Sequence, residues 1–341
     1  NSAPRFVSAY EAPVPFNSSG RPLFDALEAT SRCIASHNNK SYEVRVGTLS
    51  VPADTKTPWR LSDPLTDHWL QSIDEKSWKR FGDIAKIRVG IKTTADNVFL
   101  GEDWSTRAPA VESSLLLPLI TQRNITPWRI SGRLDTKVLY PYDLSSERRR
   151  VLNIEDWPGA SAYLRRHEGQ LRGRKYVIEG GREWYEIWVP QRPALWAKPK
   201  IVFPDISESP RFALDTSGAV VNGNCYWISL ADVQEESHAY LILAVANSSF
   251  GLRYYDEVCG NRLYSGKRRW ITQYVKRLPL PRPDTAEARS LVAFARRLST
   301  SMSITPDLLM RLDEKVEAAF DDSQARSAPG EDREEFSTTL F

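Results

Sequence analysis

The irregular order of the strand signals in residues 78–283 is the feature that most constrains the fold of this chain. Four short apolar runs bounded by turn residues predict strands: Ile84–Val89, Val138–Tyr140, Lys200–Phe203 and Ala219–Leu230. The last run contains Asn222-Gly223, a dipeptide favoured in hairpin turns. Because these strands do not alternate regularly with helices as in βαβ units, we predict an α+β fold with a mixed sheet.

The C-terminal third predicts helices. Residues 235–250 have a continuous apolar face, and the chain after Pro283 repeats this pattern twice. Asp284 is a candidate N-cap with Glu287 in the reciprocal position, and Thr305 followed by a proline predicts the start of the last helix. We therefore expect a C-terminal helical segment packed on the parent domain.

A length of 341 residues suits two or three structural units. We predict a connector over 1–75, a recognition domain over 76–283, helices over 284–320 and a flexible acidic tail over 321–341. In the connector, Leu23–Ile34 predicts a helix and Tyr42–Val46 a strand. The chain begins with Asn and has only two methionines, so we expect it to be a fragment of a longer protein.

The sequence offers no recognisable catalytic or metal-binding motif. Three widely spaced cysteines (Cys33, Cys225 and Cys259) and four scattered histidines fit neither a disulfide framework nor a zinc site, and we expect a reducing cytoplasm. Neither a signal peptide nor an apolar run long enough for a membrane is visible. The Pro-Pro dipeptide of amino-methyltransferases and the Gly-rich phosphate loops are absent. A nuclease built on Asp205 is an alternative, but we predict no catalytic residue and no metal ligand.

A basic and aromatic segment is the clearest sign of a nucleic-acid partner. Residues 258–283 contain seven basic side chains and no acid, although the net charge of the chain is only +3. Basic side chains bind phosphates, and aromatic rings or Arg planes stack on bases. The candidate DNA contacts are Arg262, Tyr264, Lys267, Arg268 and Arg269. The alternative is pairing of these arginines with Asp256 or Glu257.

Two polar loops precede this segment and complete the predicted site. The first offers Lys92, Thr93, Thr94 and Asn97, and its alternative role is a turn with side-chain caps. The second offers Gln122, Arg123 and Asn124, whose amides suit adenine edges, against the alternative of a hydrogen-bond network at a strand end. We predict that the two loops and the basic segment share one concave surface shaped for a duplex.

Taken in order, five stretches of the sequence resemble one known family. They are Lys86–Leu100, Leu115–Ile130, Tyr163–Pro193, Lys198–Asp215 and Ala246–Pro283. The set is similar to the TaqI-like C-terminal specificity domain of type II and type IIG adenine-specific DNA methyltransferases, over roughly residues 76–320. The matching positions are Gly90-Ile91-Lys92-Thr93, Arg123 through Trp128, Trp184-Tyr185-Glu186, Lys198 through Ile201, Asn247-Ser248, Gly260 through Leu263, Ser265-Gly266 and Tyr274 through Pro281. One departure is Thr94, where the family often has Gly.

The resemblance implies a function for the chain and for its parent. The chain would be the sequence-specific double-stranded DNA recognition module of an N6-adenine methyltransferase or restriction-modification enzyme. The catalytic domain would lie upstream in the same polypeptide and bind S-adenosylmethionine, so we expect no cofactor in this chain. The alternative is a protein–protein module in a phage-defence methyltransferase complex, in which the basic segment would be incidental.

Overall fold

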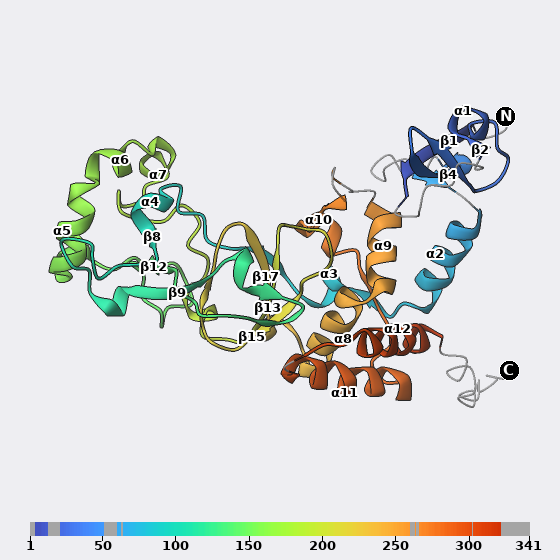
Figure 1. Cartoon of the computed structure of the whole chain (residues 1–341). Coiled ribbons are helices and arrows are strands. Elements are labelled where there is room, and N and C mark those ends of the chain that lie inside the picture. The colour runs from blue at the N-terminus through green and yellow to red at the C-terminus, as the bar shows by residue number, and fades with distance from the viewer. Residues whose placement is uncertain are drawn as a thin grey trace, which may run out of the picture. The chain divides into compact units, whose positions relative to one another are not determined.

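The computed structural model describes residues 4–12, 21–50, 60–62, 64–259, 263, 266–301 and 303–321. The chain divides into two compact units, Asn1–Glu75 and Lys76–Phe341, which Figure 1 colours from blue to red along the sequence. Helix α2 (Pro64–Lys76) ends at this division. The predicted acidic tail, beyond its first residue, lies outside the described residues.

The first unit is a small sheet. Its strands are β1 (Arg5–Glu11), β2 (Arg21–Pro22), β3 (Cys33–His37), β4 (Lys40–Ser50) and β5 (Arg60–Ser62), and their order is β1-β4-β3-β2 with β5 also on β4. The predicted strand Tyr42–Val46 lies in β4 and is confirmed. The predicted helix Leu23–Ile34 is wrong beyond α1 (Leu23–Ala26). Its last two residues, Cys33 and Ile34, begin β3, where Cys33 pairs with Val44 in an antiparallel ladder.

The second unit contains two larger sheets. The six-stranded sheet has the order β10-β11-β15-β13-β17-β7, and the four-stranded sheet has the order β16-β9-β12-β8. Their bounds are β7 (Ile87–Val89), β8 (Leu100–Gly101), β9 (Leu116–Ile120), β10 (Ile125–Thr126), β11 (Trp128–Ile130), β12 (Lys137–Leu139), β13 (Lys200–Pro204), β15 (Ala213–Asp215), β16 (Val220–Val221) and β17 (Cys225–Ser229). The pairs β11–β15 and β16–β9 are parallel and the others antiparallel, which confirms the predicted mixed sheet of an α+β fold.

The predicted hairpin at Asn222-Gly223 is wrong in one respect. The turn exists, because the Cys225 amide donates to the Asn222 carbonyl at 2.9 Å. However, the two strands that leave it enter different sheets: β16 pairs with β9, and β17 pairs with β13 and β7. Turn residues determine the reversal of the chain, but the buried partners of the flanking strands determine which sheet each one joins.

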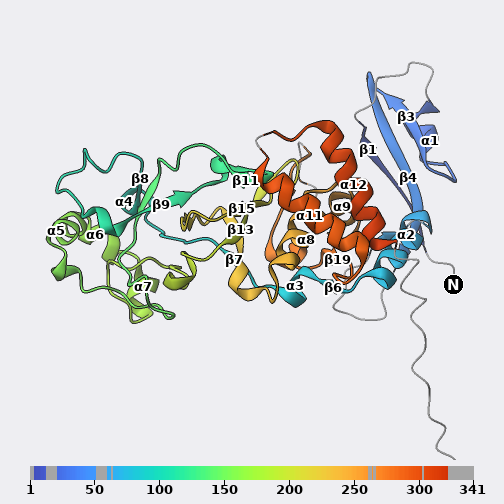
Figure 2. The ribbon, with the colours of Figure 1, turned by 90° about the horizontal axis from the view of Figure 1, so that it is seen from below.

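The helices form two groups, one beside the four-stranded sheet and the other beside the six-stranded sheet, as Figures 1 and 2 both show. One group comprises α4 (Asp96–Phe99), α5 (Pro158–Arg166), α6 (Glu168–Arg172) and α7 (Lys175–Glu179). The other comprises α3 (Phe81–Ile84), α8 (Glu236–Asn247), α9 (Ser249–Cys259), α10 (Thr272–Val275), α11 (Ala286–Thr300) and α12 (Pro306–Phe320). Two short ladders join this second group: β6 (Lys79–Arg80) with β19 (Pro279–Leu280), and β14 (Ile206–Ser207) with β18 (Arg268–Arg269).

The predicted helices of the C-terminal third are confirmed, with one correction at a cap. Thr305 caps α12 and Pro306 is its first residue, as predicted. The N-cap of α11 is Thr285, which accepts a hydrogen bond from the Ala288 amide at 3.1 Å, and not Asp284. Among the described residues, no helix has the length and the apolar character needed to cross a membrane.

Candidate nucleic-acid interface

The first predicted loop leaves the end of β7 and leads into α4. Lys92, Thr94 and Asn97 are exposed, whereas Thr93 is buried with a relative exposure of 2%. The Thr93 hydroxyl donates to Asp96 and accepts from the Ala95 amide, so it holds the turn that leads into the short helix. The alternative role of a capped turn therefore applies to Thr93, while the three exposed side chains remain candidates for DNA contact.

Thr94 has φ = +58°, a left-handed conformation in which a β-branched residue is strained. Glycine adopts this conformation without a steric penalty. The loop thus keeps the backbone that a glycine at this position would favour, although the residue differs from the family pattern.

A buried arginine and a glutamine hold this loop against helices α6 and α7. Arg174 donates to the carbonyls of Thr93 at 2.9 Å, Trp184 at 2.7 Å and Leu171 at 3.2 Å. Burial lowers the pKa of the Arg174 guanidinium from its ordinary value. Gln170 exchanges two hydrogen bonds with Asn97, at 2.9 and 3.3 Å. Nothing in the sequence pattern singled out Arg174 or Gln170, because the loop residues that they contact, Thr93 and Asn97, lie more than 70 residues away in the sequence.

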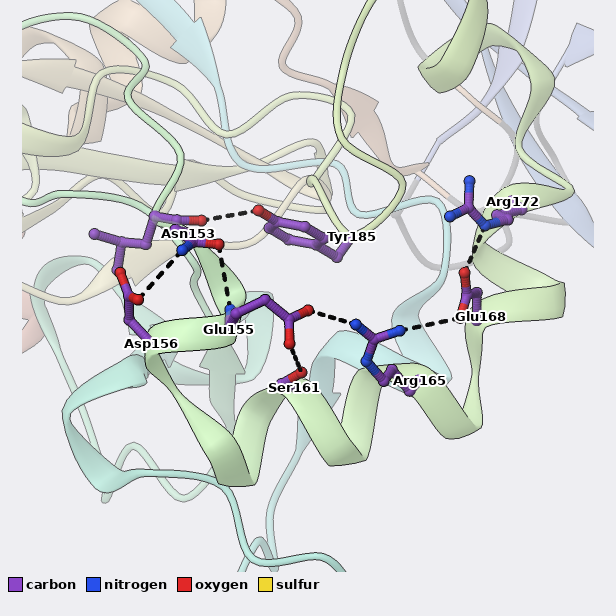
Figure 3. A network of polar contacts seen from close by, with 9 residues as sticks. Asn153, Glu155, Asp156, Ser161, Arg165, Glu168, Arg172 and Tyr185 are labelled. Atoms are coloured by element: carbon purple, nitrogen blue, oxygen red, sulfur yellow. Dashed lines mark hydrogen bonds and ion pairs between the residues drawn. The ribbon is translucent and has the colours of Figure 1, made fainter.

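The helices that support this loop are themselves tied by a chain of charges, shown in Figure 3. Arg165 donates to Glu155 at 2.5 Å, and Arg172 donates to Glu168 at 2.7 Å. Arg165 also lies 4.0 Å from Glu168, which links the two pairs. These exposed pairs neutralise much of the positive charge of α5 and α6, so this surface is not a basic patch.

The second predicted loop is a turn at the end of β9. Gln122 and Arg123 are exposed. The Asn124 side chain accepts from the Thr121 amide and hydroxyl, both at 2.9 Å, and donates to the Arg133 carbonyl at 3.3 Å. Its amide is therefore used within the fold, as the strand-end alternative expected, and only Gln122 and Arg123 point their functional groups to solvent.

The basic segment is described only in part, because Arg262 and Tyr264 lie outside the described residues. Lys267 is exposed. Arg268 forms a bidentate pair with Asp256, at 2.8 Å for both contacts, and the exposures of the two side chains are 13% and 8%. The alternative pairing of Arg268 with Asp256 is thus formed, and it neutralises the charge of this arginine inside the fold. Arg269 lies 3.4 Å from Asp205 but keeps an exposure of 52%.

The three segments converge on the turn of residues 222–225, which we call the junction turn. The Gly90 amide donates to the Cys225 carbonyl at 2.8 Å, and the Asn222 amide donates to the Ile120 carbonyl at 2.9 Å. Through these bonds the first and second loops start at the same turn.

The basic segment reaches the junction turn through Asp205. The Asp205 amide donates to the Asn224 carbonyl at 2.9 Å, and the Trp270 amide donates to the Asp205 carbonyl at 2.7 Å. The turn therefore connects all three predicted patches through backbone hydrogen bonds.

Two glycines allow this close approach. A Cβ on Gly90 would lie 2.0 Å from the Asn222 carbonyl oxygen, and a Cβ on Gly223 would lie 2.4 Å from the Ile91 carbonyl oxygen. Both contacts are with backbone atoms, which cannot move away as a flexible side chain can. Close packing of the backbone thus explains why glycine occupies position 90 of the first stretch and position 223 of the turn.

Two lysines of the fourth stretch do not serve the interface equally. Lys200 is fully buried and lies 2.8 Å from Asp215, so it cannot reach a phosphate. Burial lowers the pKa of the Lys200 ammonium group, against the opposing effect of Asp215. Lys198 is exposed. Among the described residues, no group of three or more His, Cys, Asp or Glu side chains is placed to hold a metal ion.

Comparisons with known proteins agree on the kind of domain. The model of the family described as the TaqI-like C-terminal specificity domain matches residues 117–280. The chain is 36% identical over 279 residues to the type II methyltransferase M.BanIII of Aneurinibacillus aneurinilyticus, covering 81% of this chain and 48% of that protein. It is 24% identical over 202 residues to M.BstVI of Geobacillus stearothermophilus, covering 59% of this chain and 34% of that protein.

A solved structure of the type IIL restriction-modification enzyme MmeI in complex with DNA has a similar fold. The TM-score is 0.50 at 14% identity, over 96% of this chain and 47% of that chain. This likeness shows the fold alone. The chain spans about half the length of the first relative and of MmeI. Residues 117–280 of this chain are accordingly similar to the TaqI-like C-terminal specificity domain, the family that the ordered motifs also indicated.

Proposed function

We propose that this chain is the sequence-specific double-stranded DNA recognition module of a type II or type IIG adenine-specific DNA methyltransferase or restriction-modification enzyme. The observation that carries the proposal is the junction turn. It connects the segments of residues 91–97, 120–124 and 205–211 with the basic strand β18. All of these except residues 91–97 lie within the residues that match the specificity domain.

The exposed side chains on these segments define the proposed contact surface. They are Lys92, Thr94, Asn97, Gln122, Arg123, Lys267 and Arg269. Lysine and arginine supply phosphate contacts, while Asn and Gln suit base edges. Arg262 and Tyr264 belong to the same proposal on sequence grounds alone.

Methyl transfer is assigned to a domain outside this chain. The relatives are methyltransferases of which this chain covers half or less, and in our proposal the remaining half binds S-adenosylmethionine and acts in the same polypeptide, in the cytoplasm. Within the described residues, the sheets are mixed and mostly antiparallel, with no Gly-rich loop between a parallel strand and a helix. The residues present therefore do not fit this cofactor, and the chain itself binds DNA and positions it.

Binding to a pool of random-sequence duplexes tests the proposal. The full chain is expected to retain duplexes, to enrich a defined sequence over successive rounds, and to lose affinity steeply as salt rises. Absence of binding at low salt, both alone and joined to the upstream half of its parent, would overturn it. A stable protein partner found together with that absence would favour the protein–protein alternative.

A further inference from the structure

Arg211 lies in the fourth of the five motif stretches but is not among the predicted DNA contacts. It lies between the short strand β14 and β15, and its neighbour Phe212 is fully buried. The Phe212 amide donates to the Asn247 side chain at 3.0 Å, and the Phe212 carbonyl accepts from Asn247 at 2.9 Å and from the Trp128 amide at 2.8 Å. The Phe212 ring also stacks on Phe203 with centroids 4.3 Å apart. The backbone that carries Arg211 is therefore held in one place.

The guanidinium of Arg211 is poorly satisfied within the fold. Its Nη1 donates to the carbonyls of Gln122 at 3.5 Å and Ile125 at 3.4 Å, both long for an N–H···O bond. Its Nε is buried and has no hydrogen-bond partner. A guanidinium has five N–H donors, so most of its capacity is unused.

Four other cations of this unit that are buried or nearly so are paired with a carboxylate or bonded to several carbonyls. Arg268 pairs with Asp256, Lys200 with Asp215 and Arg88 with Asp232, while Arg174 donates to three carbonyls. Arg211 forms no ion pair with any carboxylate of the described residues; the nearby Asp205 pairs with Arg269 instead. A partly buried charge without a counter-charge destabilises a fold unless an anion from outside completes it.

Arg211 also lies beside two segments of the proposed surface. Its two carbonyl contacts belong to the turn that carries Gln122 and Arg123. Burial raises the pKa of the Cys225 thiol to about 12, and the same thiol is affected in opposite directions by the charges of Arg211 and Asp205. Arg211 is thus near both the second loop and the junction turn.

We propose that Arg211 binds a backbone phosphate of the DNA duplex and supplies the central fixed charge of the surface. This inference rests on the proposed function. A guanidinium held by a rigid backbone loses little freedom on binding, and a phosphate oxygen provides the missing anionic acceptor. The contact positions the duplex against the loops that carry Lys92 and Gln122 and does not itself select a base.

The test measures the affinity of the full chain for its selected duplex as a function of salt. Arg211→Ala is expected to lower the slope of log K against log salt by about 0.9, the contribution of one phosphate, and to weaken binding about fivefold at physiological salt. The selected sequence is expected to stay the same. Arg211→Lys, which keeps the charge, is expected to recover most of the salt slope. The matched control is Arg296→Ala. It removes an exposed arginine of α11 that lies 2.9 Å from Glu236 of α8.

The outcomes separate this inference from the proposed function. If the unsubstituted chain binds no duplex, the proposed function fails. If it binds but Arg211→Ala keeps the full salt slope, or changes the selected sequence instead, Arg211 does not bind a phosphate. Thermal unfolding of each variant checks folding. A salt slope that is reduced in Arg211→Ala and recovered in Arg211→Lys supports the contact, even if both variants unfold at a lower temperature.

Discussion

The guanidinium of Arg268 and the carboxylate of Asp256 form a bidentate pair, with Nε–Oδ1 and Nη2–Oδ2 both at 2.8 Å. Two further donations from Arg268 Nη1 reach the carbonyls of Glu208 at 2.5 Å and Gly266 at 2.8 Å. The residue therefore ties α9, β14 and β18 together. Its neighbours Lys267 and Arg269 are exposed, whereas Arg268 itself is paired within the fold.

Replacing Arg268 tests this structural role. Arg268→Ala would leave the buried Asp256 carboxylate without its partner, and we expect the free energy of unfolding to fall by about 3 kcal/mol. Lys267→Ala, one residue earlier and exposed, is the matched control and is expected to change it by less than about 0.5 kcal/mol. Urea unfolding measures both. A variant Arg268→Ala that is as stable as the parent chain but binds DNA weakly would instead restore the original prediction of a DNA contact.

Replacing Arg174 tests how the first loop is positioned. Arg174→Met removes the guanidinium that donates to the carbonyls of Thr93, Trp184 and Leu171, and we expect a loss of about 2 kcal/mol in unfolding free energy. Hydrogen exchange over residues 92–97 is expected to rise in the same variant. The exposed neighbour Lys175→Met serves as the control. Unchanged exchange in these residues would show that the loop holds its conformation without Arg174.

Replacing Thr94 tests the strain in the same loop. An L-residue in the left-handed region costs roughly 1–2 kcal/mol, while glycine loses more backbone entropy on folding by roughly 0.5–1 kcal/mol. We expect Thr94→Gly to stabilise the chain by about 0.5 kcal/mol in urea unfolding. Thr94→Ala keeps the strained backbone and is expected to bring no such gain. Equal destabilisation by both variants would contradict the assigned φ of +58°.

Glu112 gives the fold a dependence on pH. Its two carboxylate oxygens accept from the amides of Gly159 at 2.7 Å and Ala160 at 2.8 Å, at the start of α5. Burial raises the pKa of this carboxyl, but its hydrogen bonds with backbone amides outweigh burial and hold the pKa below 4.5. A depressed carboxyl pKa contributes stability above the unfolded value of 4.5, and this stability is lost as pH falls through the folded pKa.

We therefore expect Glu112→Gln to be less stable than the parent chain by about 1 kcal/mol at neutral pH. The difference in unfolding free energy should shrink as the pH falls below 4.5, because protonation then makes the parent carboxyl neutral, like the glutamine amide. Urea unfolding of both chains across this range measures the difference, with the exposed Glu102→Gln as the control. A difference that stays constant down to strongly acid pH would mean that the carboxylate charge is not what caps α5.

Features governed by neighbours in sequence were predictable. The cap at Thr305 and the helix of residues 235–250 depend on residues within one or two turns of one another, and the structure confirms the cap and the helix as far as Asn247. The fold class followed from the irregular order of short strands. The ordered motifs identified the specificity domain because each motif fixes a local feature, such as the close approach of Gly90 to the junction turn.

Features governed by distant partners were not predictable. Nothing in the local pattern indicated that Arg268 would choose Asp256 over solvent, that Lys200 would be buried against Asp215, or that β16 and β17 would enter different sheets. Each outcome depends on which residues meet after folding. For the same reason Arg211 stood out only when the acids around it were found to pair with other cations.

The central claim is that the loops joined by the junction turn form one DNA-contacting face. Photo-crosslinking of the full chain to its selected duplex, followed by mass spectrometry of the attached peptides, tests it most directly. We expect attachment within residues 91–97, 122–125 and 205–211 and around Lys267, in the same complexes. Attachment confined to α5 and α6, or to α11 and α12, with these segments unmodified, would contradict it.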